Sequence, residues 1–261
     1  MASDLLAPPR LSLRTLAVWR RNFLVWRKLA IPSLLGNLAD PLIYMVGLGY
    51  GLGQLVPEVA GGPYIAFLAA GTVSYSTMNS ATFEALYSGF SRMHVQKTWE
   101  AIMNAPVSLD DIVLAEILWA CTKALFSGTA ILLVVGALGY ADPLHALWAL
   151  PVLALTGLTF AALGMAVTAV SPSYDFFMYY FTLLLTPMAL VSGVFFPAAQ
   201  LPPAVAAVAE VLPLAHVVQL IRPLLAGQWP VDVPAHVAVL LAYALLGFVL
   251  AVVLARRRLL K

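Results

Sequence analysis

Long apolar stretches, separated by short polar connections, occupy most of the sequence from residue 33 to residue 254. Interpreted as helices, they predict six membrane spans, at residues 33–55, 64–90, 112–138, 147–170, 174–195 and 235–254. An α-helix needs roughly 20 residues to cross the hydrocarbon core of a bilayer, and these stretches have about that length or more. The pattern therefore predicts an all-α polytopic membrane protein with six transmembrane helices.

The segment before the first span has the spacing of an amphipathic helix. Leu16, Trp19, Phe23 and Trp26 recur every three or four residues and share one helical face, while basic side chains project from the other. Tryptophan beside cations is typical of a helix that lies in the membrane interface. Residues 10–31 are therefore predicted to form an interfacial helix. A helix packed on a soluble domain is the less favoured alternative, because no other segment has a soluble composition.

Residues 196–234 are apolar but do not form one continuous helix, because they contain seven prolines. Two short helices that dip into the outer leaflet suit this segment, with Pro203 and Pro213 limiting the first and Pro223 ending the second. Non-helical backbone at membrane depth is tolerated only where protein buries it or where it lines a cavity. A re-entrant helical pair is therefore predicted before the last span.

The distribution of charge predicts the orientation. The chain is 62% hydrophobic and only 10% charged, whereas soluble domains carry about 25% charged residues. Twelve of the fourteen Lys and Arg residues lie before the first span, in the loop at 92–109, or in the last six residues. Basic residues near span ends are retained in the cytoplasm, so both termini and this loop are predicted to be cytoplasmic.

The sequence lacks the signatures of the common enzyme classes. It has no phosphate-binding loop, no His-Glu-x-x-His and no Gly-x-Ser-x-Gly. The four histidines are dispersed, and Cys121 is the only cysteine. The chain is therefore not expected to be an enzyme, and no metal, cofactor or nucleic acid is expected to bind it.

Ionisable side chains at bilayer depth are costly, so each requires a partner or a function. Glu116 and Lys123 lie seven residues apart, two helical turns, which favours pairing with each other or with a neighbouring helix. Asp40 and Glu84 either form structural pairs or line a polar path. Asn79 and several hydroxyl residues make the second span unusually polar, which fits such a path.

Four glycines in the first span form two overlapping Gly-x-x-x-Gly spacings: Gly47, Gly49, Gly51 and Gly53. Missing side chains let a second helix approach closely, as in membrane dimer interfaces. The spacing therefore predicts either a subunit interface, which we name the dimer seam, or close packing within one chain.

Aromatic side chains gather at the start of the fifth span, Tyr179 and Tyr180 among them. One interpretation is an interfacial belt of the ordinary kind. The other is a stacking surface for sugar rings or lipid tails, which Tyr44 and Tyr75 extend.

Seven segments carry a resemblance to one family of transporters. They are WRRNFLVWRK at 19–28, GNLADPLIY at 36–44, TWEA at 98–101, DIVL at 111–114, SYD at 173–175, LPLAH at 212–216 and LIRP at 220–223. In this order and spacing the chain resembles, over nearly its whole length, the permeases of the nodulation-factor exporters. These fall within the ABC type-2 exporter permeases.

The resemblance implies that residues 1–261 form one transmembrane domain of a bacterial inner-membrane exporter. Two copies would assemble with two copies of a separate ATPase, which binds the ATP and Mg²⁺ that this chain does not bind. By the same likeness, a short coupling helix in the cytoplasmic loop would dock on the ATPase through Gln96, Lys97, Thr98, Trp99 and Glu100. Together with the polar second span, the resemblance places the substrate path at Asp40, Tyr44, Tyr75, Asn79, Glu84, Tyr179 and Tyr180.

Close relatives in that family export lipo-oligosaccharides, so the expected cargo is an amphipathic lipid-linked oligosaccharide that contacts membrane lipid. A drug or lipid exporter of the same family is the nearest alternative. An ion-coupled carrier or channel without an ATPase is a more distant one, because such proteins usually contain paired inverted repeats that this sequence does not clearly display.

Overall fold

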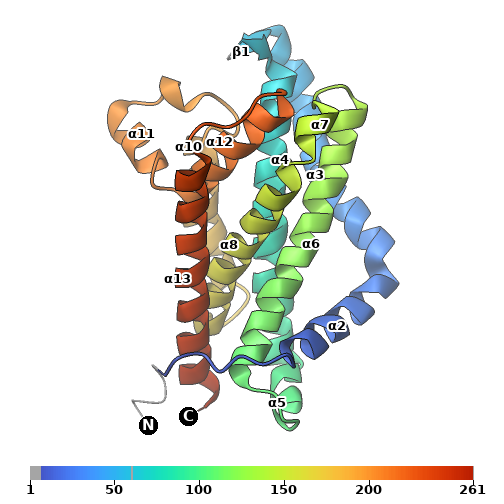
Figure 1. Ribbon diagram of the computed structural model, residues 1–261, viewed down its shortest axis with the longest axis vertical. Coiled ribbons are helices and arrows are strands. Elements are labelled where there is room, and N and C mark those ends of the chain that lie inside the picture. Colours follow the sequence, from blue (N-terminus) through green and yellow to red (C-terminus); the bar gives the residue numbers. More distant parts are fainter. Residues whose placement is uncertain (1–6, 60, 261) are drawn as a thin grey trace.

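The computed structural model describes residues 7–59 and 61–260, with the backbone but not the side chain of Asp40. Helices run between two ends of the molecule (Figure 1). One end, which we call the terminal end, holds both chain termini and α5 (Thr98–Met103). The opposite end, the hairpin end, holds the short antiparallel pair β1 (Glu58–Val59) and β2 (Gly62–Pro63).

A bundle of long helices forms the body of the molecule. Its members are α3 (Ala30–Gly51), α4 (Tyr64–Phe83), α6 (Leu109–Ala137), α8 (Ala149–Val170) and α13 (Val233–Leu259). The central helix is α8, which packs on α13, α6 and α4. One continuous apolar core joins these helices to α12. The all-α fold class predicted from the apolar stretches is therefore confirmed.

The N-terminal helix α2 (Thr15–Trp26) crosses α6 obliquely at the terminal end and joins α3 through the turn η1 (Arg27–Leu29) (Figure 1). Its aromatic face lies in part against α6. Trp19 Nε1 donates to Thr122 Oγ1 at 3.1 Å, and the Trp26 ring meets the Trp119 ring edge to face. Such aromatic pairs stabilise by about 0.5–1.5 kcal/mol beyond burial, which favours packing on α6.

The helical conformation continues beyond the end of α4 without a break. It continues through two π-helical turns, η3 (Glu84–Ser88) and η4 (Ser91–Val95), and stops at Lys97, whose φ of 51° is left-handed. The next long helix, α6, starts with a capping box in which the Ser108 hydroxyl accepts from the Asp111 amide.

The remaining segments are short and lie at the hairpin end or after α8. They are η2 (Leu52–Gln54), α7 (Pro143–Ala146), α9 (Phe176–Tyr180), η5 (Phe181–Leu185), α10 (Thr186–Val191), η6 (Ala198–Gln200), α11 (Pro203–Ala209) and α12 (Pro213–Leu225). The last two are bent by 84°, so the predicted helical pair before the last span is confirmed. The predicted end at Pro223 is wrong. Proline removes one amide donor only, and the Ala226 amide still donates to the Arg222 carbonyl, so α12 continues to Leu225.

Among the described residues, four helices are long and apolar enough to cross a membrane, or five if the bent pair counts as one span. These four are Thr15–Gln54, Leu109–Ala137, Pro143–Val170 and Val233–Leu259. The polar helix α4 and the shorter apolar segment Phe176–Val191 are not among them. The structure therefore confirms an all-α membrane protein but does not by itself give six spans.

A backbone contact closes the bundle towards the hairpin end. A Cβ built on Gly71 of α4 would lie 2.1 Å from the carbonyl oxygen of Val194, in the loop after α10. Tyr64 OH also donates to the Phe195 carbonyl at 3.1 Å. The loop at 192–196 can therefore reach α4 only because residue 71 has no side chain.

We expect Gly71→Ala to lower the free energy of unfolding by about 1–3 kcal/mol, the usual effect of overpacking a dense core. The measurement is chemical denaturation of the purified protein in mixed micelles. Gly136→Ala in α6 is the matched control, because its Cβ would meet nothing within 4 Å. Equal stability of the two variants would contradict the close approach.

Candidate functional site

A polar cavity of about 270 Å³ lies between α3 and α4, near the lower limit of the roughly 300–1,000 Å³ typical of ligand pockets. Val194 and Phe195 line it from the loop after α10, and Phe83 lines it from the last turn of α4. Three of the predicted substrate-path residues line this cavity together: Tyr44, Tyr75 and Asn79.

The wall of the cavity is polar because α4 turns its hydroxyl groups towards it. Thr72, Ser76 and Ser80 recur every four residues, so they share one helical face, and Ser127 faces them from α6. The hydroxyl oxygens of Ser80 and Ser127 are buried, and no described residue hydrogen-bonds them. Buried polar atoms are usually paired, so this wall suits a hydroxyl-rich ligand or ordered water.

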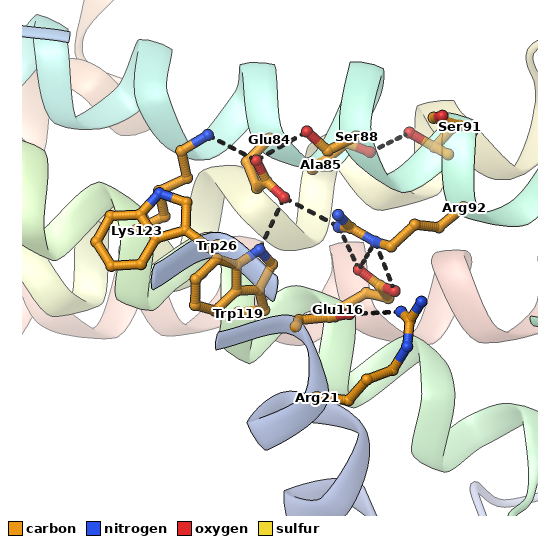
Figure 2. A network of polar contacts seen from close by, with 12 residues as sticks. Arg21, Trp26, Glu84, Ala85, Ser88, Ser91, Arg92, Glu116, Trp119 and Lys123 are labelled. Carbon is orange, nitrogen blue, oxygen red and sulfur yellow. Dashed lines mark hydrogen bonds and ion pairs between the residues drawn. The ribbon is translucent and has the colours of Figure 1, made fainter. Parts of the chain in front are cut away.

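Four charged side chains form a buried network on the terminal side of this cavity (Figure 2). Arg92 Nη2 lies 3.0 Å from Glu84 Oε1 and 2.6 Å from Glu116 Oε2. Lys123 Nζ lies 2.8 Å from Glu84 Oε2, and Trp119 Nε1 donates to Glu84 Oε1 at 2.8 Å. Two cations thus balance two carboxylates inside the bundle.

This network decides between the two pairings proposed for Glu116 and Lys123. They do not pair with each other: Glu116 binds Arg92 of η4, and Lys123 binds Glu84 of η3. Both carboxylates are almost fully buried, so each requires a cation nearby. The arrangement supports the prediction that Glu84 forms structural ion pairs. Glu84 also lines a separate pocket of about 610 Å³ beside α2.

Helix α5 is attached to this network through Trp99. Its indole is 1% exposed and Nε1 donates to Glu116 Oε1 at 3.2 Å, so the expected contact of Trp99 with an ATPase is wrong. The reason is that Trp99 lies on the face of α5 that packs against the bundle. Gln96, Lys97 and Glu100 are exposed and Thr98 is half-buried, so a partner can reach these residues.

Two acidic residues at the start of α6, Asp110 and Asp111, tie this helix to α13 and to the segment around the start of α2, which no sequence pattern had indicated. Arg256 of α13 donates to Asp110 from Nε at 2.9 Å and from Nη2 at 2.5 Å. Ser12 and Thr15, before and in α2, donate to Asp111. The Ser-x-x-Asp pattern of the capping box marked the start of this helix but not the ion pair with the last helix.

The aromatic start of the predicted fifth span packs only in part inside the molecule. Phe177 and Phe181 contact the ring of Tyr87, which follows α4. Tyr179 is 63% exposed, Tyr180 packs at the edge of the core, and neither lines the cavity. The side chain of Asp40 lies outside the described residues. The predicted path residues are therefore only partly brought together.

The glycine spacings of α3 separate into two faces. A Cβ on Gly49 would lie 2.9 Å from Ile65 Cγ1, and one on Gly53 would lie 4.0 Å from Tyr64 Cδ1, so these glycines face α4. A Cβ on Gly47 or on Gly51 would meet nothing within 4 Å. Gly49 and Gly53 therefore allow close packing within the chain, and a subunit interface stays a prediction for Gly47 and Gly51.

No three His, Cys, Asp or Glu side chains in the described part of the chain lie close enough to hold a metal ion. The nearest approach of two histidines joins α12 to α13, where His216 Nδ1 and His236 Nδ1 lie 2.8 Å apart. At this distance the two ring nitrogens share one hydrogen bond when one carries a proton and the other does not.

A family model described as "ABC-2 type transporter" matches residues 14–226. The chain belongs to this family. "Nodulation protein J" of Rhizobium meliloti (strain 1021) is 53% identical over 244 residues, which cover 94% of this chain and 93% of that protein. "Nodulation protein J" of Rhizobium leguminosarum bv. trifolii is 52% identical over 98% of this chain and 97% of its own.

A more distant relative is "Inner membrane transport permease YadH" of Escherichia coli (strain K12), 22% identical over 72% of this chain and 73% of its own. An ABC-2 permease is a transmembrane subunit that is not itself catalytic, and it normally works with an ABC ATPase subunit. The resemblance found in the sequence is therefore confirmed at the level of the family and of the nodulation protein J relatives.

We expect Arg92→Met to lower the free energy of unfolding by about 3–5 kcal/mol, because it leaves two buried carboxylates without their common cation. Lys123→Met should cost less, about 1–3 kcal/mol, because Glu84 keeps Arg92, Trp119 and Ser88 as partners. Denaturation in mixed micelles measures both values.

The matched control for these two variants is Lys97→Met, which removes an exposed cation and so changes the net charge by the same amount as they do. Its stability should lie within about 0.5 kcal/mol of the unaltered protein. If Lys123→Met lowered the free energy of unfolding more than Arg92→Met, the larger contribution assigned to Arg92 would be refuted.

Proposed function

We propose that this ABC-2 permease is the membrane half of an ATP-driven exporter in a bacterial inner membrane. Two copies assemble with two copies of a separate ATPase, which supplies ATP and Mg²⁺ binding. The chain crosses the membrane six times with both termini in the cytoplasm. The cations support this orientation, because Arg256, Arg257 and Arg258 lie at the same end as α5 (Figure 1).

The proposed cargo is an amphipathic lipid-linked oligosaccharide. The observation that carries this proposal is the cavity between α3 and α4, whose wall combines hydroxyl groups and the Asn79 amide with the rings of Tyr44 and Tyr75. Hydroxyl-rich sugars hydrogen-bond such polar groups and pack on aromatic rings. Tyr44 is 51% exposed on the outer surface of α3, so the cavity borders the lipid, where an acyl chain can remain.

The network around Arg92 supports a route for coupling. Trp99 connects α5 to Glu116, Arg92 connects Glu116 to Glu84, and Glu84 continues directly from α4. A displacement of α5 by the ATPase is thereby transmitted to the helix that lines the cavity. ATP binding then favours one of two arrangements of the permease, as differential binding requires.

The exposed glycines of α3 support a contact between two permease copies. Gly47 and Gly51 lie one helical turn apart and face away from α4, with exposed Ile43 and Tyr44 on neighbouring turns. Two copies of such a surface pack closely in membranes. In this dimer, the helix that carries the seam also carries Tyr44 of the cavity.

A drug or lipid exporter of the same family is the alternative. An apolar cargo gains little from a wall of hydroxyl and amide groups, so the cavity favours a sugar. An ion-coupled carrier is less favoured, because Glu84 and Glu116 are both paired with cations.

We expect Glu100→Ala to reduce stimulation of the partner ATPase at least about fivefold, because it removes an exposed charge from the coupling helix. The matched control is Glu58→Ala, an exposed carboxylate of β1 at the opposite end. The measurement is ATP hydrolysis by the reconstituted complex. Unchanged stimulation with Glu100→Ala would remove the coupling assignment.

We expect Asn79→Leu to reduce cargo export by roughly tenfold, the effect of about 1.4 kcal/mol, while the complex still assembles and hydrolyses ATP. The change keeps the size of the side chain and removes its hydrogen bonds to the cargo. Gln200→Leu, which replaces an exposed amide outside the cavity, is the control and should export normally. Normal export by Asn79→Leu would exclude a path through this cavity.

A further inference from the structure

A second pocket lies at the hairpin end, on the outer side in the orientation proposed above. It encloses about 600 Å³ between the β1–β2 turn, the start of α4 and the C-terminal part of α12. Val59, Ala66, Phe67, Val218 and Val231 give it apolar walls, and Gln219, Gln228 and Tyr140 add neutral polar groups. Its one permanent charge among the described lining residues is Arg222.

Arg222 is held in a fixed position that leaves most of its donors unused. The guanidinium carbon lies 3.7 Å from the centre of the Phe67 ring, and Nη2 donates to the Gly193 carbonyl at 2.6 Å. Nε is buried without an acceptor, and no described residue accepts from Nη1. A guanidinium has five N–H donors in a planar fork, so one bond to a neutral carbonyl leaves its capacity largely unmet.

No carboxylate of the described residues pairs with this cation. The ion pairs of the described structure involve other residues, and the lining of the pocket contains neither Asp nor Glu. Asp142 lies behind the wall, where its amide donates to the Leu225 carbonyl. Its carboxylate instead accepts from His145 and from the Leu144 amide, and these bonds hold its pKa below the usual range.

A partly buried, unpaired cation destabilises the protein unless an anion approaches it. The planar fork of arginine matches two oxygens of a phosphate, sulfate or carboxylate group. The apolar walls on either side suit the hydrocarbon part of the same molecule. A small free anion would leave those walls in contact with water.

We propose that this pocket binds the phosphate group of an amphipathic lipid through Arg222, with Gln219 and Gln228 at its rim. The site is separate from the cavity between α3 and α4, since the two share no lining residue. It is connected to that cavity through one contact. Arg222 holds Gly193, and the next residues, Val194 and Phe195, line the cavity. A bound phosphate therefore acts on the residue that positions this loop.

The test measures binding of phosphatidylglycerol to the full-length protein by native mass spectrometry after reconstitution in nanodiscs. Arg222→Gln is expected to weaken binding about tenfold, equivalent to about 1.4 kcal/mol. Arg257→Gln, an exposed cation at the terminal end, is the charge-matched control and should bind as the unaltered protein does. Because the readout is lipid binding, it is independent of cargo export and of any ATPase.

A second variant keeps the test valid if Arg222→Gln disturbs folding through the lost bond to Gly193. Gln219→Glu places a carboxylate three residues before Arg222 on the same face of α12, where it can neutralise the cation. Gln219 is exposed, so the fold should be retained, and lipid binding should again fall about tenfold. Weaker binding in both variants, but not in Arg257→Gln, supports the site.

Three results would overturn the proposal. One is equal binding of phosphatidylglycerol by all variants. Another is weaker binding with Arg222→Gln but not with Gln219→Glu, which would leave Arg222 as a structural support for Gly193 only. The third is binding of inorganic phosphate alone as tightly as phosphatidylglycerol, which would identify a site for a free anion and not for a lipid.

Discussion

The bidentate contact between Arg92 and Glu116, shared with Glu84, is the interaction on which the terminal half of this permease depends. Without Arg92, two carboxylates inside an apolar bundle lose their common counter-charge. Their mutual repulsion would then separate α6 from the segment after α4. The contact also fixes α5, because the indole of Trp99 donates to the same carboxylate. Stability and the proposed transmission of movement thus depend on the same few atoms.

The polar character of α4 is explained by its position inside the bundle. Its hydroxyl groups lower the apolarity of the helix, and on composition alone it is a poor membrane span. Within the bundle these groups face the interior, where some donate to carbonyls of their own helix and others line the cavity. Neighbouring helices shield them from lipid. A helix in this position can carry a polar wall because α3, α6 and α8 cover it.

The sequence was sufficient for the class of fold and for the helical pair before the last span. Each depended on a local signal: apolar length or proline content. It was not sufficient for pairings between distant residues. Glu116 and Lys123 have the spacing of partners on one helix, yet each found a partner on the segment after α4. The same limit applies to Asp110 and Arg256, which are 146 residues apart. Trp99 shows a further limit, because the sequence did not indicate that its indole reaches a carboxylate of another helix.

The uninterrupted run from Tyr64 to Val95 has a mechanical consequence. As one helix it forms a rod of roughly 45–50 Å, longer than the hydrocarbon core of a bilayer. Arg92 clamps this rod near one tip, which makes that point a fulcrum. A tilt of about 5° there would sweep the far tip by some 3–4 Å by simple geometry, given the rise of about 1.5 Å per residue. A displacement too small to change the packing of the terminal half would therefore still move the start of α4 at the hairpin end.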